Sequence, residues 1–95
     1  MSVITLAHRT GVYTLTQNHV NNMFSVAYQA RVEKTDLDRK LISQGWEERL
    51  LDCIKKDEPW LYKNLKSIAK GKTKKPRAKV PPDWSPFIES YWNKI

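Results

Sequence analysis

The sequence predicts a small, mainly α-helical domain of three to four helices, with a short β-hairpin at its N-terminal end. Apolar residues recur at three- and four-residue steps over most of the chain after residue 17, which is the spacing of one helical face. β-branched residues gather in the first 16 residues. The 95 residues suffice for one compact core, and an aromatic share of 11% is higher than disordered chains usually carry.

The hairpin is predicted over residues 3–16, which read VITLAHRTGVYTLT. Two runs rich in β-branched residues flank the turn-like segment HRTG, which ends at Gly11. A single extended N-terminal arm is the alternative interpretation. An isolated hairpin is only marginally stable in water, so a hairpin here must pack against the helices.

The first helix is predicted over residues 18–33, with Asn18 as its N-cap. Its apolar face consists of Val20, Met23, Phe24, Ala27 and Ala30. The opposite side carries amide side chains and no charge until Arg31. Such a face can be a contact surface, although a solvated surface is the commoner explanation.

Residues 36–56 predict helical structure with a break near Gly45. The apolar residues are Leu37 and Leu41 before the break, and Trp46, Leu50, Cys53 and Ile54 after it. Continuing the first stripe would place acids in the core, so its phase must shift, and glycine favours a helix end. Thr35 followed by Asp38 resembles a capping arrangement. The break also suggests a helix-turn-helix, but the acids on both sides of it would be repelled by phosphate.

The next helix is predicted over residues 58–70. Asp57 or Glu58 can cap it, Pro59 fits its first turn, and Gly71 is well placed to end it. Its apolar stripe consists of Leu61, Leu65, Ile68 and Ala69. The sequence thus indicates a compact domain over residues 1–71.

The rest of the chain divides into a linker and a final helix. Residues 72–83 hold three prolines and five basic residues, which predicts a flexible or extended linker. Residues 84–95 predict an amphipathic helix with Ser85 as N-cap and Pro86 in the first turn. Its apolar face consists of Trp84, Phe87, Ile88, Tyr91, Trp92 and Ile95.

The aromatic face of the final helix has three interpretations. Docking on the chain's own core is slightly favoured, because such stripes are usually core. Docking on a partner, including a second copy of the chain, is the alternative that the preceding linker allows. Stacking of nucleic-acid bases on Trp84 or Trp92 ranks third, since aromatics at helical spacing are usually packed.

The charge pattern points to a polyanion as partner. The net charge is +7 with a pI near 9.7, and residues 63–79 hold eight bases and no acid. These bases are Lys63, Lys66, Lys70, Lys72, Lys74, Lys75, Arg77 and Lys79, called here the basic segment. Phosphate contacts release counterions and need little geometry, so even a flexible segment can bind nucleic acid. A merely solubilising segment is the alternative, and binding is favoured over it.

No catalytic or metal site is predicted, and no cofactor. The histidines are His8 and His19, and no spacing suits a metal. Cys53 lies on an apolar helical face and is expected to be buried and unreactive. The three glycines form no phosphate loop, and adjacent acids such as Glu47 and Glu48 do not face each other on a helix.

The location is expected to be the cytosol. One cysteine cannot form an internal disulfide, and no stretch has the length and hydropathy of a signal peptide or membrane span. In a eukaryote the segment KTKKPRAK would also fit nuclear import.

The leading functional prediction is a non-enzymatic protein that binds DNA or RNA through backbone contacts of the basic segment. The alternative is an adaptor or inhibitor, for example of a nucleic-acid enzyme, that binds a protein through the basic segment and the aromatic helix. No membrane partner is predicted, and the oligomeric state stays open.

Overall fold

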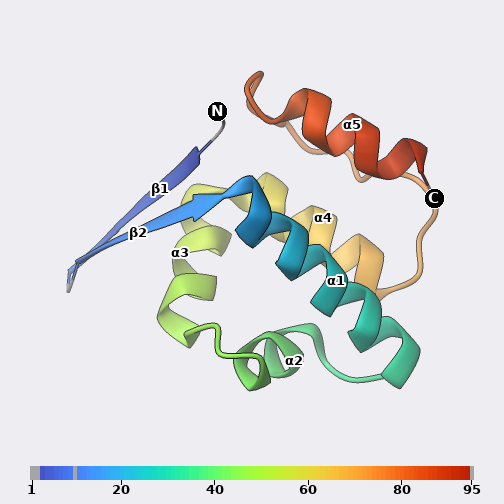
Figure 1. The fold of residues 1–95 in the computed structure, drawn as a ribbon, viewed down its shortest axis with the longest axis horizontal. Helices are drawn as coiled ribbons and strands as arrows, with labels where there is room; N and C mark the ends of the chain where they lie inside the picture. Colours follow the sequence, from blue (N-terminus) through green and yellow to red (C-terminus); the bar gives the residue numbers. More distant parts are fainter. Residues whose placement is uncertain (1–2, 10, 95) are drawn as a thin grey trace.

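A computed structural model describes residues 3–9 and 11–94 and confirms the mainly α-helical fold with an N-terminal hairpin (Figure 1). The described elements are β1 (Val3–His8), β2 (Gly11–Thr16), α1 (Gln17–Glu33), α2 (Leu37–Ser43), α3 (Glu48–Asp57), α4 (Pro59–Ala69) and α5 (Ser85–Asn93). Five helices are thus described, because the predicted break at Gly45 separates α2 from α3 completely.

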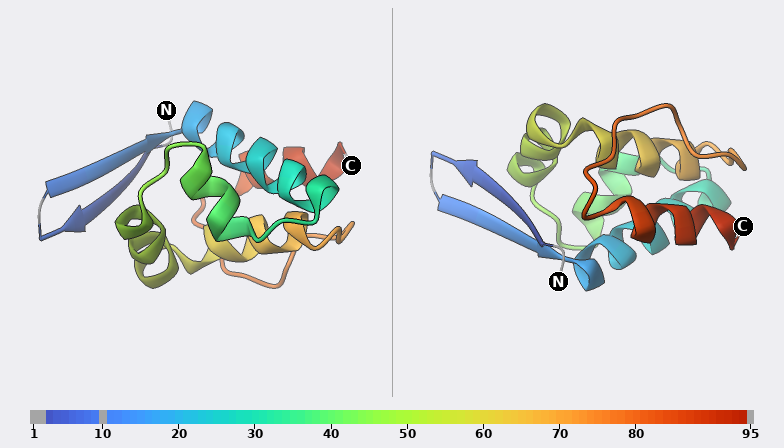
Figure 2. Two further views of the ribbon diagram at one scale, coloured as in Figure 1. Left: turned by 90° about the horizontal axis from the view of Figure 1, so that it is seen from below. Right: turned by 90° about the horizontal axis from the view of Figure 1, so that it is seen from above.

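The hairpin is antiparallel and projects from one end of the helical body (Figure 2). Its register runs from Val3 opposite Thr16 to His8 opposite Gly11. Since side chains alternate between the faces of a strand, one face carries Ile4, Leu6 and Leu15 into the core. The hairpin therefore has the support from the helices that its stability requires.

The N-terminus of α1 is capped two residues earlier than the sequence predicted. Thr16 is the N-cap instead of Asn18: its hydroxyl accepts from the His19 backbone N–H, and its own N–H donates to His19 Nδ1 at 3.0 Å. The prediction of Asn18 was wrong because β2 runs straight into α1, which places the boundary at Thr16. The buried face of α1 consists of Val20, Met23, Phe24, Val26, Ala27 and Ala30.

The segment between α1 and α3 confirms one prediction and corrects another. Gly45 has a φ of 99° and follows α2, as expected for a glycine that ends a helix. The predicted cap at Thr35 was wrong, because the Asp36 carboxylate accepts from the Arg39 backbone N–H at 3.1 Å. Trp46 is half-buried against the core, and its indole Nε1 is buried without a hydrogen-bond partner.

The long α4 begins at Pro59 and ends before Gly71, as predicted. Glu58 occupies the N-cap position without a side-chain hydrogen bond to the helix, and its carboxylate accepts from Trp60 Nε1 at 2.6 Å instead. Gly71 has a φ of 78°, and a Cβ there would lie 2.9 Å from Arg31 Nε. The positive φ of this turn therefore favours glycine, whereas the close contact is with a flexible side chain that can shift.

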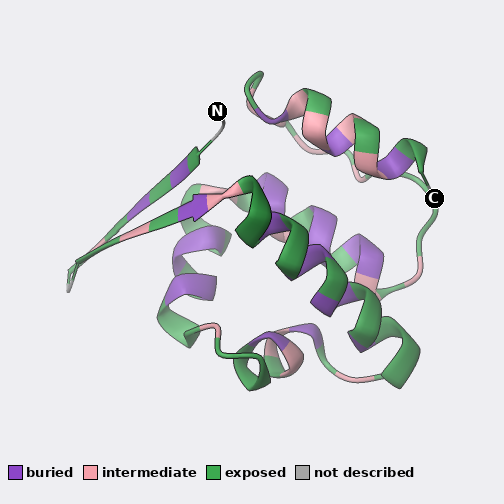
Figure 3. Ribbon diagram, viewed as in Figure 1, coloured by how far each residue is buried: buried purple, intermediate pink, exposed green. Residues whose placement is uncertain are grey.

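The α5 helix docks on the core of its own chain, which decides between the alternatives for its aromatic face in favour of packing. Trp84, Ile88 and Trp92 are buried, and Phe87 and Tyr91 are partly buried against them (Figure 3). Ring centroids lie 4.6 Å apart between Phe24 and Tyr91, and 5.8 Å apart between Trp60 and Trp84.

The start of α5 differs from the prediction. Trp84 stands at the N-cap and Ser85 is already helical, because the turn that begins at Pro81 leads directly into the helix: the Ser85 N–H donates to the Pro81 carbonyl. The predicted face member Ile95 lies outside the described residues.

A buried amide fixes the position of α5 on α4. Asn64 is 1% exposed; its Nδ2 donates to the Trp60 carbonyl at 2.6 Å, and its Oδ1 accepts from Trp92 Nε1 at 2.7 Å. Buried polar groups are costly unless paired, and here the amide and the indole satisfy each other. The bond therefore specifies where Trp92 sits, which apolar packing alone would leave less defined.

Residues 72–81 contain no helix or strand, in agreement with the proline content. The sequence offered no apolar run for burial in this segment. Ala78 and Val80 are nevertheless half-buried against the core, so the linker follows the body. The described residues before the linker, the linker and α5 thus share one hydrophobic core.

Candidate nucleic-acid interface

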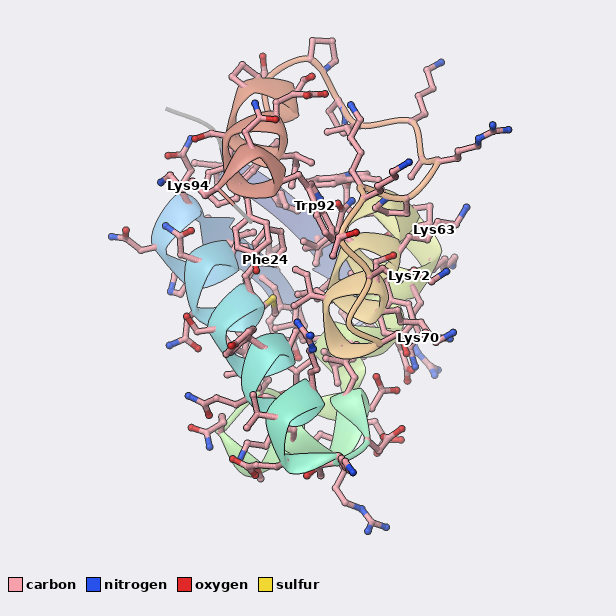
Figure 4. The ribbon with its side chains drawn as sticks, turned by 90° about the vertical axis from the view of Figure 1, so that its right-hand side faces the viewer. Phe24, Lys63, Lys70, Lys72, Trp92 and Lys94 are labelled. Atoms are coloured by element: carbon pink, nitrogen blue, oxygen red, sulfur yellow. The ribbon has the colours of Figure 1, made fainter. Side chains whose placement is uncertain are left out.

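The outward face of α4 is cationic. Lys63 and Lys66 of α4 and Lys70 at its C-cap are exposed, while Trp60, Leu61, Leu65 and Ile68 on the other face are buried. Seven residues of helix place the first and last of these lysines about 10 Å apart along the axis. Lys63, Lys70 and Lys72 extend from the same side of the molecule (Figure 4). The helix thus presents its lysines as a row with fixed spacing.

The loop after Gly71 continues this surface. Lys72, Lys74, Lys75, Arg77 and Lys79 are all exposed. A hollow of about 540 Å³ is lined by Ser67, Gly71, Lys72, Thr73, Lys74, Lys75, Pro76 and Arg77. Ammonium, guanidinium and hydroxyl groups are the donors that phosphate oxygens accept from.

Arg31 adds a ninth cation that sequence reasoning missed. The side chain lies over Gly71, at the junction between the lysine row and the loop. The two residues are 40 positions apart, so only the packing of α1 beside α4 brings them together. The apolar spacing of the two helices was the available signal, but it does not say which helices are neighbours.

One acid of α5 reduces the charge of the loop. Lys75 Nζ forms an ion pair with Glu89, and both side chains are about half exposed. Within residues 3–9 and 11–94, Lys75 is the one member of the basic segment in an ion pair. The sequence prediction counted Lys75 as fully available, and the structure assigns it an internal counter-charge.

Asp38 lies near the lysine row and forms an ion pair with Lys55. Its carboxylate accepts from Lys55 Nζ at 2.7 Å and from the Tyr62 hydroxyl at 2.9 Å. The hydrogen bond to Asp38 raises the pKa of Lys55, and burial together with the same carboxylate raises the pKa of Tyr62. Lys66 Nζ lies 5.7 Å from the centroid of the Tyr62 ring. The cluster ties α2, α3 and α4 together beneath the cationic face.

The exposed face of α1 is chemically different. It carries no charged residue between Gln17 and Ala30, and its exposed members are Gln17, Asn18, His19, Asn21, Asn22, Ser25, Tyr28 and Gln29. This is the uncharged face that the sequence predicted. It lies on the other side of the molecule from Lys63, Lys70 and Lys72 (Figures 1 and 4). The positive charge therefore lies on the side of α4 and the following loop, and not on the exposed face of α1.

The aromatic residues predicted to bind a partner are packed in the core of the chain itself. Trp84 is 2% and Trp92 7% exposed, and Ile88, Phe87 and Tyr91 pack with them. Trp92 Nε1 is bonded to Asn64 and the Trp84 ring packs on Trp60 and Phe87. While α5 is docked, neither indole offers a face to a base or to another protein.

The described residues show no assembled metal site. Among residues 3–9 and 11–94, no three His, Cys, Asp or Glu side chains are grouped to hold an ion. Cys53 is buried, as predicted. It lines a hollow of about 450 Å³ together with His8, Arg9, Asp52, Lys56 and Asp57, a grouping that the sequence did not predict. Across the described part of the chain, every helix is too short or too polar to traverse a bilayer.

In comparisons with known proteins, no family model, no curated protein and no solved structure matches this chain.

Proposed function

We propose that this protein binds nucleic acid without catalysis, and that the basic segment contacts the phosphate backbone. The observation that carries the proposal is that Lys63, Lys70 and Lys72 extend from one side of the molecule (Figure 4) and that the other bases of the segment are exposed as well. The eight bases of the segment, joined by Arg31, exceed the net charge of +7 of the whole chain.

The chemistry of the segment favours contacts that are independent of base sequence. Seven of its eight bases are lysines, which act as point charges, whereas bidentate recognition of a guanine edge is typical of arginine. Each lysine that meets a phosphate releases a counterion, so affinity should fall steeply with salt. The lysines on α4 are held at fixed spacing, and the loop, which has no helix or strand, can adjust to the path of the nucleic-acid backbone.

The decisive experiment neutralises the loop. The variant Lys72→Gln, Lys74→Gln, Lys75→Gln, Arg77→Gln, Lys79→Gln should keep its melting temperature, because all five side chains are exposed. The slope of log affinity against log salt on duplex DNA should fall by about four to five if each base meets one phosphate. The loss should be similar on unrelated sequences, since backbone contacts carry no base information.

The matched control removes five charges elsewhere. Arg9, Lys34, Arg39, Lys56 and Lys94 are exposed and lie outside the basic segment, so changing each to Gln gives the same net charge. This control should retain most of the salt slope. An equal loss in both variants would indicate attraction by net charge alone, and an unchanged slope in the loop variant would refute the proposal.

Binding of an acidic protein surface is the second candidate, because the same cations would serve it. The two are separated by the absorbance ratio at 260 and 280 nm of the purified protein before and after a high-salt wash. Co-purifying nucleic acid that high salt removes supports the first candidate. Without it, and without measurable affinity for DNA or RNA, the protein-binding alternative becomes the better explanation.

A further inference from the structure

The hairpin is the uncharged part of a strongly basic molecule. Neither β1 nor β2 contains Asp, Glu, Lys or Arg, whereas each of the five described helices contains at least one. Arg9, in the turn, is the one charged residue between the strands. Two copies of a chain with net charge +7 repel each other, so a contact between copies is least opposed at this element.

The outer edge of β2 has no partner among the described strands. The sheet has two strands; β1 also contacts α3, whereas β2 has its main contacts with β1 and α1, and in the described part of this edge only the Thr16 N–H at its end is already bonded, to His19 Nδ1. An edge strand leaves backbone N–H and C=O groups unpaired and is a template for further pairing. Proteins usually protect such edges with Lys, Pro or a bulge, and β2 contains neither residue and pairs with β1 in continuous register.

β2 is rich in residues that favour strands, and some of them are exposed rather than packed on the core. Val12, Tyr13, Thr14, Leu15 and Thr16 include the residue types that favour strands most. Val12 is 66% exposed, the most exposed large hydrophobic residue described. On the outer face of the hairpin, Val12 and Thr14 form an uncharged β-branched surface beside the free edge.

We infer that β2 pairs antiparallel with β2 of a second copy, which makes a continuous four-stranded sheet. In an antiparallel pair about a two-fold axis, residue i of one copy faces residue j of the other and residue j faces residue i, so a register centred on Thr14 places this threonine opposite its own copy. Such a contact suits β2, since β-branched and threonine pairs across strands are favourable and the strand contains no charged residue. A foreign peptide could use the same edge, but nothing in its composition selects a partner of opposite charge.

The placement of the hairpin also suits a dimer. The end of α4 lies at the end of the long axis remote from the hairpin, and the segment after it begins there and then runs back along α5 (Figures 1 and 2). Pairing through β2 therefore keeps the ends of α4 and the starts of the two basic loops far apart, which reduces their repulsion. If the proposed function holds, the dimer carries two phosphate-binding surfaces at its outer ends, and both can engage one nucleic acid.

The test measures the mass of the full chain by light scattering and sedimentation equilibrium, without nucleic acid and at about 0.5 M salt, where charge repulsion is screened. The expected mass is twice the 11.2 kDa of one chain at concentrations on the order of 100 μM, since a strand-edge interface is small. Thr14→Lys and Thr14→Glu should each be monomeric, and an equal mixture of the two should regain the double mass. Thr14→Val should remain dimeric.

The control for added charge is Ser25→Lys, on the exposed face of α1, which should dimerise like the wild type. Circular dichroism confirms that every variant is folded. A wild-type mass of one chain at all concentrations, or Thr14→Lys with unchanged dimerisation, would overturn the inference. Neither result affects the proposed phosphate contacts, because the neutralised loop variant is read out by affinity and should keep the dimer mass.

Discussion

Residues 72–83 and residues 84–93 follow each other directly in the chain, but they are attached to the body by different forces. The first segment is held by half-buried Ala78 and Val80 and by the exposed pair of Lys75 with Glu89. The second buries two tryptophans and an isoleucine and forms a buried hydrogen bond to Asn64. The linker thus carries charge and α5 contributes stability. Each of these two properties can therefore be changed with little effect on the other.

The largest effect is expected from removing a buried ring of α5. Trp84→Ala should lower the free energy of unfolding by about 3–5 kcal/mol, because the ring packs on Trp60 and Phe87 and leaves a cavity. Chemical denaturation measures the change. Ser90→Ala, on the exposed side of the same helix, should change stability by less than about 0.5 kcal/mol. Equal stability of the two variants would mean that α5 does not dock on this core.

A smaller effect is expected at the buried amide. Asn64→Leu should cost about 1–3 kcal/mol, because Trp92 Nε1 is left buried without an acceptor. Adding Trp92→Phe removes that donor, so the double variant should recover part of the loss. The coupling free energy from the double-mutant cycle is the measurement. Strictly additive effects would show that the hydrogen bond does not link the two helices.

The attachment of the basic loop can be tested at Glu89. Glu89→Gln should cost less than about 1 kcal/mol of stability, since exposed ion pairs contribute little. It should strengthen nucleic-acid binding and steepen the salt slope by up to about 0.9, because Lys75 becomes available to a phosphate. Lys75→Gln combined with Glu89→Gln should abolish that gain. Unchanged binding in the single variant would show that Lys75 does not contact the ligand.

The smallest effect is expected at alkaline pH. Burial raises the pKa of Tyr91 above the usual value of 10.0, with a further contribution from Tyr28. A group whose pKa is raised by folding contributes stability that is fully present below pH 10.0 and is lost as the pH rises through the raised value. Tyr91→Phe should therefore lose less stability between neutral and alkaline pH than the wild type. An identical pH dependence would indicate that Tyr91 is exposed and α5 undocked.

Local features of the fold could be predicted from the sequence, because they depend on a few neighbouring residues. Gly45 and Gly71 end helices through their own backbone freedom, and the burial of Leu50, Cys53 and Ile54 follows from their spacing. The helix starts were less predictable, since capping residues stand close together. Thr16 competes with Asn18, and the continuous path from β2 into α1 decides between them.

Relations between distant residues could not be predicted. The stripe on residues 84–95 looks the same whether it docks on its own core or on a partner, and the contacts with Phe24 and Trp60 decide. The positions of Arg31 over Gly71 and of Glu89 beside Lys75 depend on which helices are neighbours. The basic segment itself was evident from composition, but its placement on one side of the molecule was not.

The late position of α5 in the sequence affects how the chain is made. Synthesis proceeds from the N-terminus, so α1 and α4 leave the ribosome before the helix that covers Phe24 and Trp60. An incomplete chain that stops within the linker would expose these aromatic rings and become a target for chaperones and proteases. A chain that stops after Lys79 would also carry the whole basic segment. If the proposed function holds, removal of such truncated products would keep unfolded but still cationic chains from accumulating on nucleic acid.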